Sequence, residues 1–104
     1  MPKMTLKSFD EMLFKQLHNP EFAHAYLEDA LSDSMDEFLI ALRKYVQANG
    51  GMAACAKKAG VTREALYRML SETGNPEFES LRSILRACGL KVHFAFDRDL
   101  VPAA

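Results

Sequence analysis

Residues 52–71 read MAACAKKAGVTREALYRMLS, and the interpretation of the whole chain depends on this stretch. Ala56 is small at the point where one helix must let the next approach closely. Gly60 follows where the chain must reverse, and Gly tolerates the positive φ that such a reversal needs. Val61 can then anchor the turn. Two helices joined by a short turn containing Gly are typical of a helix-turn-helix, whose second helix enters the major groove of DNA.

The second predicted helix has one apolar face and one face of long polar side chains. Thr62 can cap its start, because a threonine hydroxyl accepts a hydrogen bond from a backbone N–H that the first turn leaves unpaired. The residues expected to face the core, from their helical spacing, are Ala65, Leu66, Met69 and Leu70. The opposite face carries Arg63, Glu64, Tyr67 and Arg68. Side chains of these types bond to base edges, reach phosphates or stack on sugars.

A charged helix face has an ordinary explanation, because any amphipathic helix presents one to solvent. In this chain the face follows directly on the Ala56–Gly60–Val61 spacing, which is an independent signal for the same motif. The two signals together favour DNA readout over a solvated surface.

Basic side chains near the motif are candidates for phosphate contacts. Many repressors carry Gln at the first position of the motif, but this chain has Met52 there, after Gly50 and Gly51. The unpaired N–H groups at that helix start can still bind a phosphate at the positive end of the helix dipole. The side chains expected to assist are Arg43, Lys44, Lys57 and Lys58.

The remaining composition indicates a small cytoplasmic protein. At 104 residues the chain has room for one core, and no run approaches the roughly 20 apolar residues of a membrane span. The start lacks the apolar region of a signal peptide, so we expect a cytoplasmic location and no membrane partner. Cys55 and Cys88 are expected to be buried free thiols rather than a disulfide. The sequence shows no metal-ligand set, no cofactor motif and no catalytic constellation, so we expect no enzyme.

The charge is unevenly distributed along the chain. Residues 1–38 contain eight acidic residues and three lysines, a net charge of −5, whereas the remainder contains ten basic and six acidic residues, a net charge of +4. A DNA-binding face needs the second pattern, because it must neutralise phosphates. The acidic half either faces solvent or contacts a basic protein, with Asp10, Glu11, Glu28 and Asp29 as the candidate charges.

Capping signals predict the helix boundaries outside the motif. Ser8 and Glu11 have the spacing of a capping box, which predicts a helix to about Leu17, and Ser34 with Glu37 predicts another to about Ala48. Two Asn-Pro pairs predict helix starts in which Asn caps and Pro takes the first position. The first pair, residues 19–20, opens a helix to about Leu31. The second, residues 75–76, opens a helix to Cys88 that is expected to bury Phe78, Leu81, Ile84 and Leu85.

The end of the chain changes to strand periodicity. Val92, Phe94 and Phe96 alternate with less apolar residues, which predicts a short strand over residues 91–96. A single strand in a helical domain either pairs with another chain or lies as an extended segment with its phenylalanines packed on the last helix.

These motifs resemble the addiction-module antidote family, HigA-like antitoxins among the lambda-repressor-like (Xre-type) helix-turn-helix proteins. The specific part is REALYRMLS at residues 63–71 with GNP at residues 74–76. The front half adds AYL at residues 25–27 and FLIAL at residues 38–42, so that the resemblance covers roughly residues 5–96. Carried over residue by residue, the base-reading helix of the family falls on Thr62, Arg63, Glu64, Tyr67 and Arg68.

The resemblance implies an all-α, lambda-repressor-like helix-turn-helix domain of five to six helices, here with a short C-terminal β-strand. Within a single domain, 1–104, we expect an acidic helical segment at 1–34, the helix-turn-helix core at 35–90 and the strand at 91–96. The family consists of homodimeric repressors that bind operator DNA and neutralise a co-encoded toxin, usually of the RelE/ParE type. The alternative is a stand-alone helix-turn-helix regulator without a toxin partner. A small, basic reading frame beside this gene would favour the antitoxin.

Overall fold

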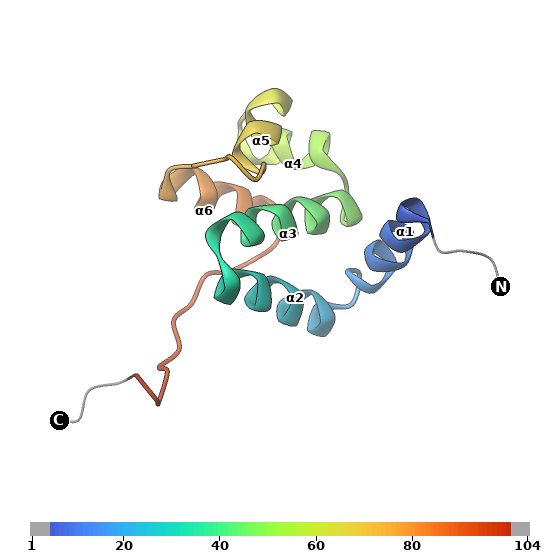
Figure 1. The fold of residues 1–104 in the computed structure, drawn as a ribbon. Coiled ribbons are helices and arrows are strands. Elements are labelled where there is room, and N and C mark those ends of the chain that lie inside the picture. The colour runs from blue at the N-terminus through green and yellow to red at the C-terminus, as the bar shows by residue number, and fades with distance from the viewer. Residues whose placement is uncertain (1–4, 101–104) are drawn as a thin grey trace.

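Helices make up nearly all regular structure in residues 5–100, the part of the chain described by this computed structural model (Figure 1). In chain order they are α1 (Leu6–Gln16), α2 (Pro20–Asp33), α3 (Met35–Ala48), α4 (Met52–Ala59), α5 (Arg63–Met69) and α6 (Phe78–Ala87). The predicted all-α class with five to six helices is confirmed for these residues. No helix among them is both long and apolar enough to cross a membrane.

Helix α3 lies at the centre of the arrangement (Figure 1). It contacts α1, α2 and α4, while α4 in turn contacts α5 and α6. In Figure 1, α2 lies on one side of α3, and α4, α5 and α6 lie on the other. Side chains from these elements meet in one main core, whose fully buried members are Leu39, Leu42, Val46, Leu66, Leu70 and Ile84. Each such side chain contributes about 1.5–3 kcal/mol by leaving water.

A smaller apolar cluster holds the front of the chain together. Leu13 of α1 and Leu17, which follows the helix directly, are buried against Ala23 of α2, with Tyr26 and Tyr45 packed at the edge. Tyr26 and Tyr45 also contact the main core, so the two clusters are continuous. The acidic front segment is therefore packed on α3 and is part of the folded body.

Two predicted helix starts are confirmed. The Asn19 side chain accepts hydrogen bonds from the N–H groups of Glu21 and Phe22, and α2 begins at Pro20 as the Asn-Pro pair predicts. At α3 the Ser34 hydroxyl accepts from the Glu37 N–H at 3.0 Å. Both caps satisfy donors that would otherwise be unpaired.

The other two predicted starts are wrong. Helix α1 begins at Leu6 and is capped three residues before the predicted cap Ser8, because the hydroxyl of Thr5 accepts from the Ser8 N–H. Helix α6 begins at Phe78, after Glu77, not at Pro76.

The late start of α6 has its cause in the preceding loop. The loop passes so close under α5 that a Cβ on Gly74 would collide with the Met69 carbonyl oxygen, and Glu77 remains extended. Phe78 was expected in the core, yet it is 67% exposed, because the first turn of α6 projects beyond the helices that form the core.

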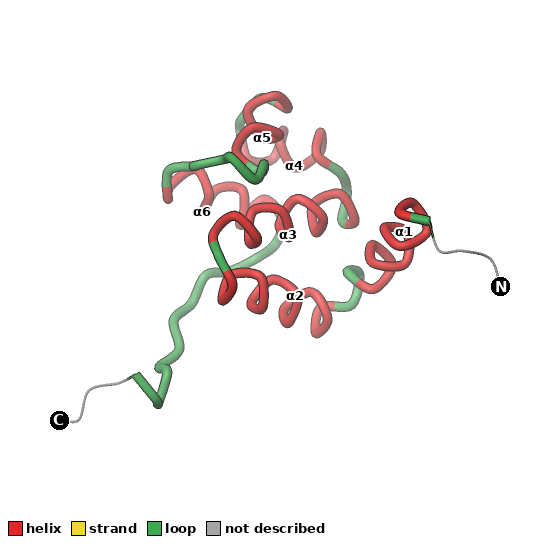
Figure 2. Tube along the Cα trace, in the orientation of Figure 1, coloured by secondary structure: helices red, strands yellow, loops and turns green. Residues whose placement is uncertain are grey.

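The predicted C-terminal strand is not formed. Residues 91–96 run away from the helices without regular structure (Figure 2) and make no backbone hydrogen bond within the described chain. A ladder needs a second strand, and residues 5–100 provide none. The alternative prediction, in which the phenylalanines of the tail pack on the last helix, is also wrong, because Phe94 is 93% exposed and Phe96 is 87% exposed.

Candidate nucleic-acid interface

The connection between α4 and α5 has the backbone geometry that its sequence predicts. Gly60 has φ +74°, in the left-handed region that favours glycine, and ends α4. The Val61 N–H then bonds to the carbonyl of Ala56 at 3.0 Å. The Thr62 hydroxyl accepts from the Ala65 N–H at 3.0 Å and caps α5. These local bonds fix the direction in which α5 leaves the turn.

Helix α5 buries one face and exposes the other, as its spacing predicts. Leu66 and Leu70 are fully buried, whereas Ala65 and Met69, which were expected in the core, lie at its edge and are half-buried. The side chains of this helix that are exposed to solvent are Arg63, Glu64 and Arg68. Short α5 thus presents a compact polar face held from behind by two leucines.

Tyr67 lies between two arginines, one from its own helix and one from α3. The guanidinium carbon of Arg43 lies 5.0 Å from the centre of the Tyr67 ring, and that of Arg63 lies 5.5 Å from it. Such cation–π contacts are attractive. Interaction with the Tyr67 side chain also raises the pKa of Arg63 above its ordinary value. The three side chains, which we call the Arg–Tyr–Arg stack, therefore connect α5 directly to α3.

The role of Arg43 in this stack could not be predicted from sequence spacing. Arg43 was expected only as a general phosphate contact, 20 residues before Arg63 in the chain. Its neighbours Leu39, Leu42 and Val46 on α3 are buried, so Arg43 has to lie at the edge of the core. The sequence shows that edge position but does not show that Tyr67 occupies the adjacent space.

The remaining predicted phosphate contacts lie on α4 and α3. Lys57 and Lys58 are exposed in the last turn of α4. At the other end of that helix Met52 is buried and contributes to the core, which explains an apolar residue at this position. Lys44 is 3.1 Å from the Asp10 carboxylate, so its charge is largely engaged within the chain. Among residues 5–100 the other ion pair is His24–Glu28, which leaves Lys57 and Lys58 free of carboxylates.

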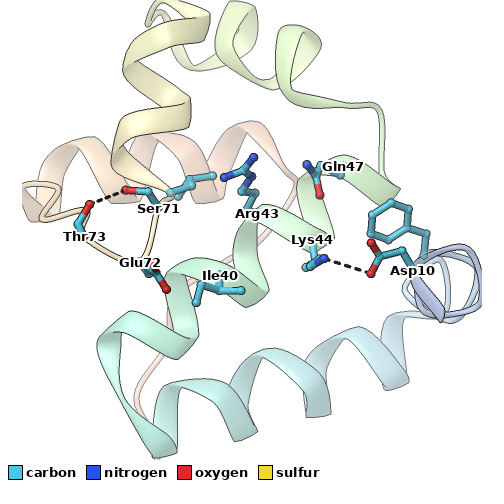
Figure 3. Close-up of a pocket in the computed structure, with 10 residues that line it drawn as sticks. Asp10, Ile40, Arg43, Lys44, Gln47, Ser71, Glu72 and Thr73 are labelled. Carbon is cyan, nitrogen blue, oxygen red and sulfur yellow. Dashed lines mark hydrogen bonds and ion pairs between the residues drawn. The ribbon is translucent and has the colours of Figure 1, made fainter. Parts of the chain in front are cut away.

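A groove of about 760 Å³ extends from the Arg–Tyr–Arg stack toward α1 (Figure 3). Figure 3 shows Arg43, Lys44 and Gln47 along α3, with Asp10 of α1 facing Lys44 and the loop from Ser71 to Thr73 near the other end. Its basic residues are balanced by Asp10 and Glu72. The groove reaches Arg43 of the stack and Leu70 at the end of α5, but it does not carry the charge excess of an anion site.

The predicted acidic contact residues are separated by the fold. Of the four candidate charges, Asp10 is paired with Lys44 and Glu28 lies 3.2 Å from His24. Asp29 instead lines a second groove of about 490 Å³ between α2 and α3, together with Asp33 and Glu37. Burial, followed by the charges of Asp10 and Glu37, raises the pKa of Tyr26 in the same region.

The two cysteines face each other across the α4–α6 contact. Their Sγ atoms are 3.5 Å apart, well beyond a disulfide bond of about 2.05 Å, and both are free thiols as predicted. Cys55 is buried, and Cys88 is only half-buried. Burial and the adjacent Cys55 raise the pKa of Cys88 to about 12, so that it remains a protonated, weakly nucleophilic thiol near neutral pH.

Comparison with known proteins identifies a family for this chain. Residues 5–96 match a family described as "Probable addiction module antidote protein". An uncharacterized protein of Haemophilus influenzae is 31% identical to this chain over 86 residues, which cover 83% of this chain and 87% of the relative. No solved structure matches the chain. The family match runs from Thr5, the cap of α1, to Phe96 in the tail.

Proposed function

Because this chain belongs to the family described as probable addiction module antidote proteins, we propose that it is an antitoxin that also represses its own operon. In this proposal it binds operator DNA as a homodimer through α5 and neutralises a co-encoded RelE/ParE-type toxin. The observation that carries the DNA-binding part is the polar face of α5, backed by buried Leu66 and Leu70 and attached to α3 by the Arg–Tyr–Arg stack.

The side chains of this face are suited to different parts of a DNA duplex. Arg63 can donate two bonds to a guanine edge, and Glu64 can accept from cytosine. Arg68 is exposed one turn further along α5. Tyr67 is half-buried between two arginines, so its hydroxyl is the part available to a phosphate. Lys57 and Lys58 would contact the backbone, which raises affinity for every sequence alike.

Two copies are needed for useful specificity. One helix of this length reads only a few base pairs, so repressors of this kind pair two recognition helices about 34 Å apart, one turn of the duplex. We therefore include a homodimer in the proposed function.

The toxin contact is proposed for the acidic side of the molecule. A protein that cleaves mRNA must attract phosphates, and an acidic partner surface complements the basic surface this requires. In Figure 1, α2 lies on the opposite side of α3 from α4 and α5. Asp29, Asp33 and Glu37 line the groove between α2 and α3. Their carboxylates are not taken up by ion pairs within residues 5–100. A toxin docked there would leave the polar face of α5 free.

The DNA arm is tested by titrating labelled DNA from upstream of the gene, and a scrambled duplex, with the wild type and Arg63→Ala. We expect Arg63→Ala to weaken specific binding by about 1–3 kcal/mol and to relax the preference at one base position. Lys57→Ala is the comparison variant, because it should weaken both duplexes alike and flatten the salt dependence. Equal affinity of the wild type for both duplexes would contradict sequence-specific binding.

The toxin arm is tested with the product of the adjacent small reading frame, co-expressed with this chain. Asp29→Lys with Asp33→Lys should weaken capture of that product, while Glu28→Lys, whose charge already faces His24, should change it less. Operator binding is measured on the same variants and should be retained. If the wild type binds DNA but captures no product of that frame, the stand-alone regulator is the correct function.

A further inference from the structure

The tail from Lys91 to Asp97 carries side chains and backbone groups that the rest of the chain does not satisfy. All seven residues are exposed, and residues 91–96 make no backbone hydrogen bond among the described residues. Phe94 and Phe96 are 93% and 87% exposed, and Val92 on the same side of an extended chain is 45% exposed. An extended segment with open backbone groups and an apolar face is a template for pairing with another strand.

The boundaries of this segment are defined on both sides. Gly89 follows α6 with φ +76°, and the Leu90 N–H bonds to the Leu85 carbonyl, which ends the helix. At the far end the Asp97 side chain accepts from the Asp99 N–H, and the Leu100 N–H bonds to the Asp97 carbonyl, forming a turn. The family match includes residues 91–96 of this segment and ends one residue before Asp97.

The sequence of the segment, KVHFAFD, is complementary to itself when two copies run antiparallel. With Phe94 opposite Phe94 of the second copy, each Val92 lies opposite Phe96. On the other face of the ribbon each Lys91 then lies opposite Asp97, so that opposite charges meet at both ends. Cross-strand pairs of aromatic with β-branched residues, and of opposite charges, are the pairs that stabilise antiparallel strands.

We propose that Lys91–Asp97 pairs with the same segment of a second copy of this chain, antiparallel and centred on Phe94, as the dimer interface. The pairing gives the backbone of residues 91–96 its missing partners and collects the exposed apolar side chains Val92, Phe94 and Phe96 on one face. Seven paired residues span about 24 Å, so the two helical bodies lie at opposite ends of the ribbon and do not collide.

Two features of the segment favour a second copy over the edge of a partner's sheet. Charge complementarity at both ends of the segment, Lys91 with Asp97, is provided by the segment itself. The register that aligns these charges also places the apolar side chains of both copies on one face of the ribbon, whereas a shift by one residue would place the apolar side chains of the two copies on opposite faces.

The inference specifies the homodimer of the proposed function, yet it is tested without DNA or toxin. If the ribbon forms but operator DNA is not bound, the proposed function fails and the ribbon remains. If operator DNA is bound but the ribbon does not form, the ribbon proposal fails and the proposed function remains.

The register is tested by cysteine cross-linking in full-length chains in which Cys55 and Cys88 are replaced by Ala. One preparation carries His93→Cys and the other Ala95→Cys, which leaves all three apolar side chains in place. In the proposed register residue 93 lies opposite residue 95 of the second copy, with Cα atoms about 5 Å apart, so the mixture should form a disulfide under mild oxidation. Each preparation alone should not, because the two identical cysteines are about 8 Å apart.

A charge exchange tests the same register without cysteines. Lys91→Asp places like charges at both ends of the ribbon and should raise the dimer dissociation constant about tenfold, measured by sedimentation. Adding Asp97→Lys to it should restore the wild-type value. Helical content by circular dichroism should remain unchanged in every variant, because the tail lies outside the core.

Three results for this chain alone would overturn the proposal. These are a wild type that stays monomeric at micromolar concentration, cross-linking of each cysteine preparation with itself, and failure of the double charge variant to recover. A tail that becomes protected from proteolysis only when the toxin is added would assign the segment to the toxin and would equally overturn it.

Discussion

The α4–α5 pair and the tail are the two parts of this molecule with strong sequence signals, and they differ in what completes them. In the α4–α5 pair, Gly60, Val61 and Thr62 find all their partners within a few residues, and Leu66 and Leu70 reach the core. In the tail, the alternation of Val92, Phe94 and Phe96 is equally clear, but the chain supplies neither a neighbouring strand nor a covering surface.

The difference shows that periodicity predicts the conformation of a segment only when its partners belong to the same chain. Helical hydrogen bonds are internal to a segment, so a helix forms where its apolar face can be buried. Strand hydrogen bonds are always made to another segment. Equally clear sequence periodicity therefore predicts a folded element in the α4–α5 pair and, as we propose, an interface with a second copy in the tail.

The largest effect is expected where the α4–α5 pair meets the core. Leu66 is fully buried, so Leu66→Ala should lower the free energy of unfolding by about 2–5 kcal/mol through lost burial and the cavity left behind. Phe78→Ala is the matched control, since Phe78 is a large apolar residue that is 67% exposed. Urea unfolding followed by circular dichroism measures both. A loss for Leu66→Ala no larger than for Phe78→Ala would show that α5 is not held by this core.

A smaller effect is expected at the turn. Gly60→Ala should destabilise the fold by about 1–2 kcal/mol, because φ is +74° and an added Cβ meets no atom within 4 Å, so backbone strain is the whole cost. Gly89→Ala is the control, with φ +76° and equally open space. The two should lose similar stability in urea, but only Gly60→Ala should alter binding of operator DNA. Equal operator affinity for both variants would separate the turn from the binding face.

These positions also show how far the sequence alone reaches. It predicted the left-handed Gly60, the caps Asn19, Ser34 and Thr62, and the exposure of three of the four polar side chains of α5, because each depends on the local sequence. The fourth, Tyr67, is half-buried because Arg43 of α3 lies against its ring. The DNA-contacting role of that face is still a prediction.

The sequence failed where more distant contacts decide. At the start of α6, the Asn-Pro pair has the composition of a cap, but the approach of Gly74 to the Met69 carbonyl keeps the chain extended beyond it. The contact between Arg43 and Tyr67 joins residues of different helices, which spacing cannot show.

That contact gives the third prediction. Arg43→Ala should weaken operator binding by about 0.5–1 kcal/mol, the usual size of a partly exposed cation–π contact, because Tyr67 and Arg63 would lose a neighbour that holds them in place. In a Tyr67→Phe background, which keeps the aromatic ring, Arg43→Ala should weaken operator binding almost as much as in the wild type. In a Tyr67→Leu background, Arg43→Ala should change operator affinity little. Fluorescence anisotropy on the four-variant cycle measures the coupling. Additive losses would mean that Arg43 acts on DNA alone and not through Tyr67.

The smallest effect on stability is expected from the largest deletion. Ending the chain after Leu90 removes Phe94 and Phe96, but both are nearly fully exposed, so little apolar burial within one copy is lost. At a dilution at which the protein is monomeric, the free energy of unfolding should therefore change by less than about 0.5 kcal/mol. At micromolar concentration the full-length chain should gain stability with concentration, as a dimer does by mass action, and the shortened chain should not. Unfolding curves at two concentrations for each chain measure this. If the stability of the shortened chain also rises with protein concentration, the dimer interface lies on the helices. If the shortened chain loses much of its free energy of unfolding at dilution, the tail packs on its own domain.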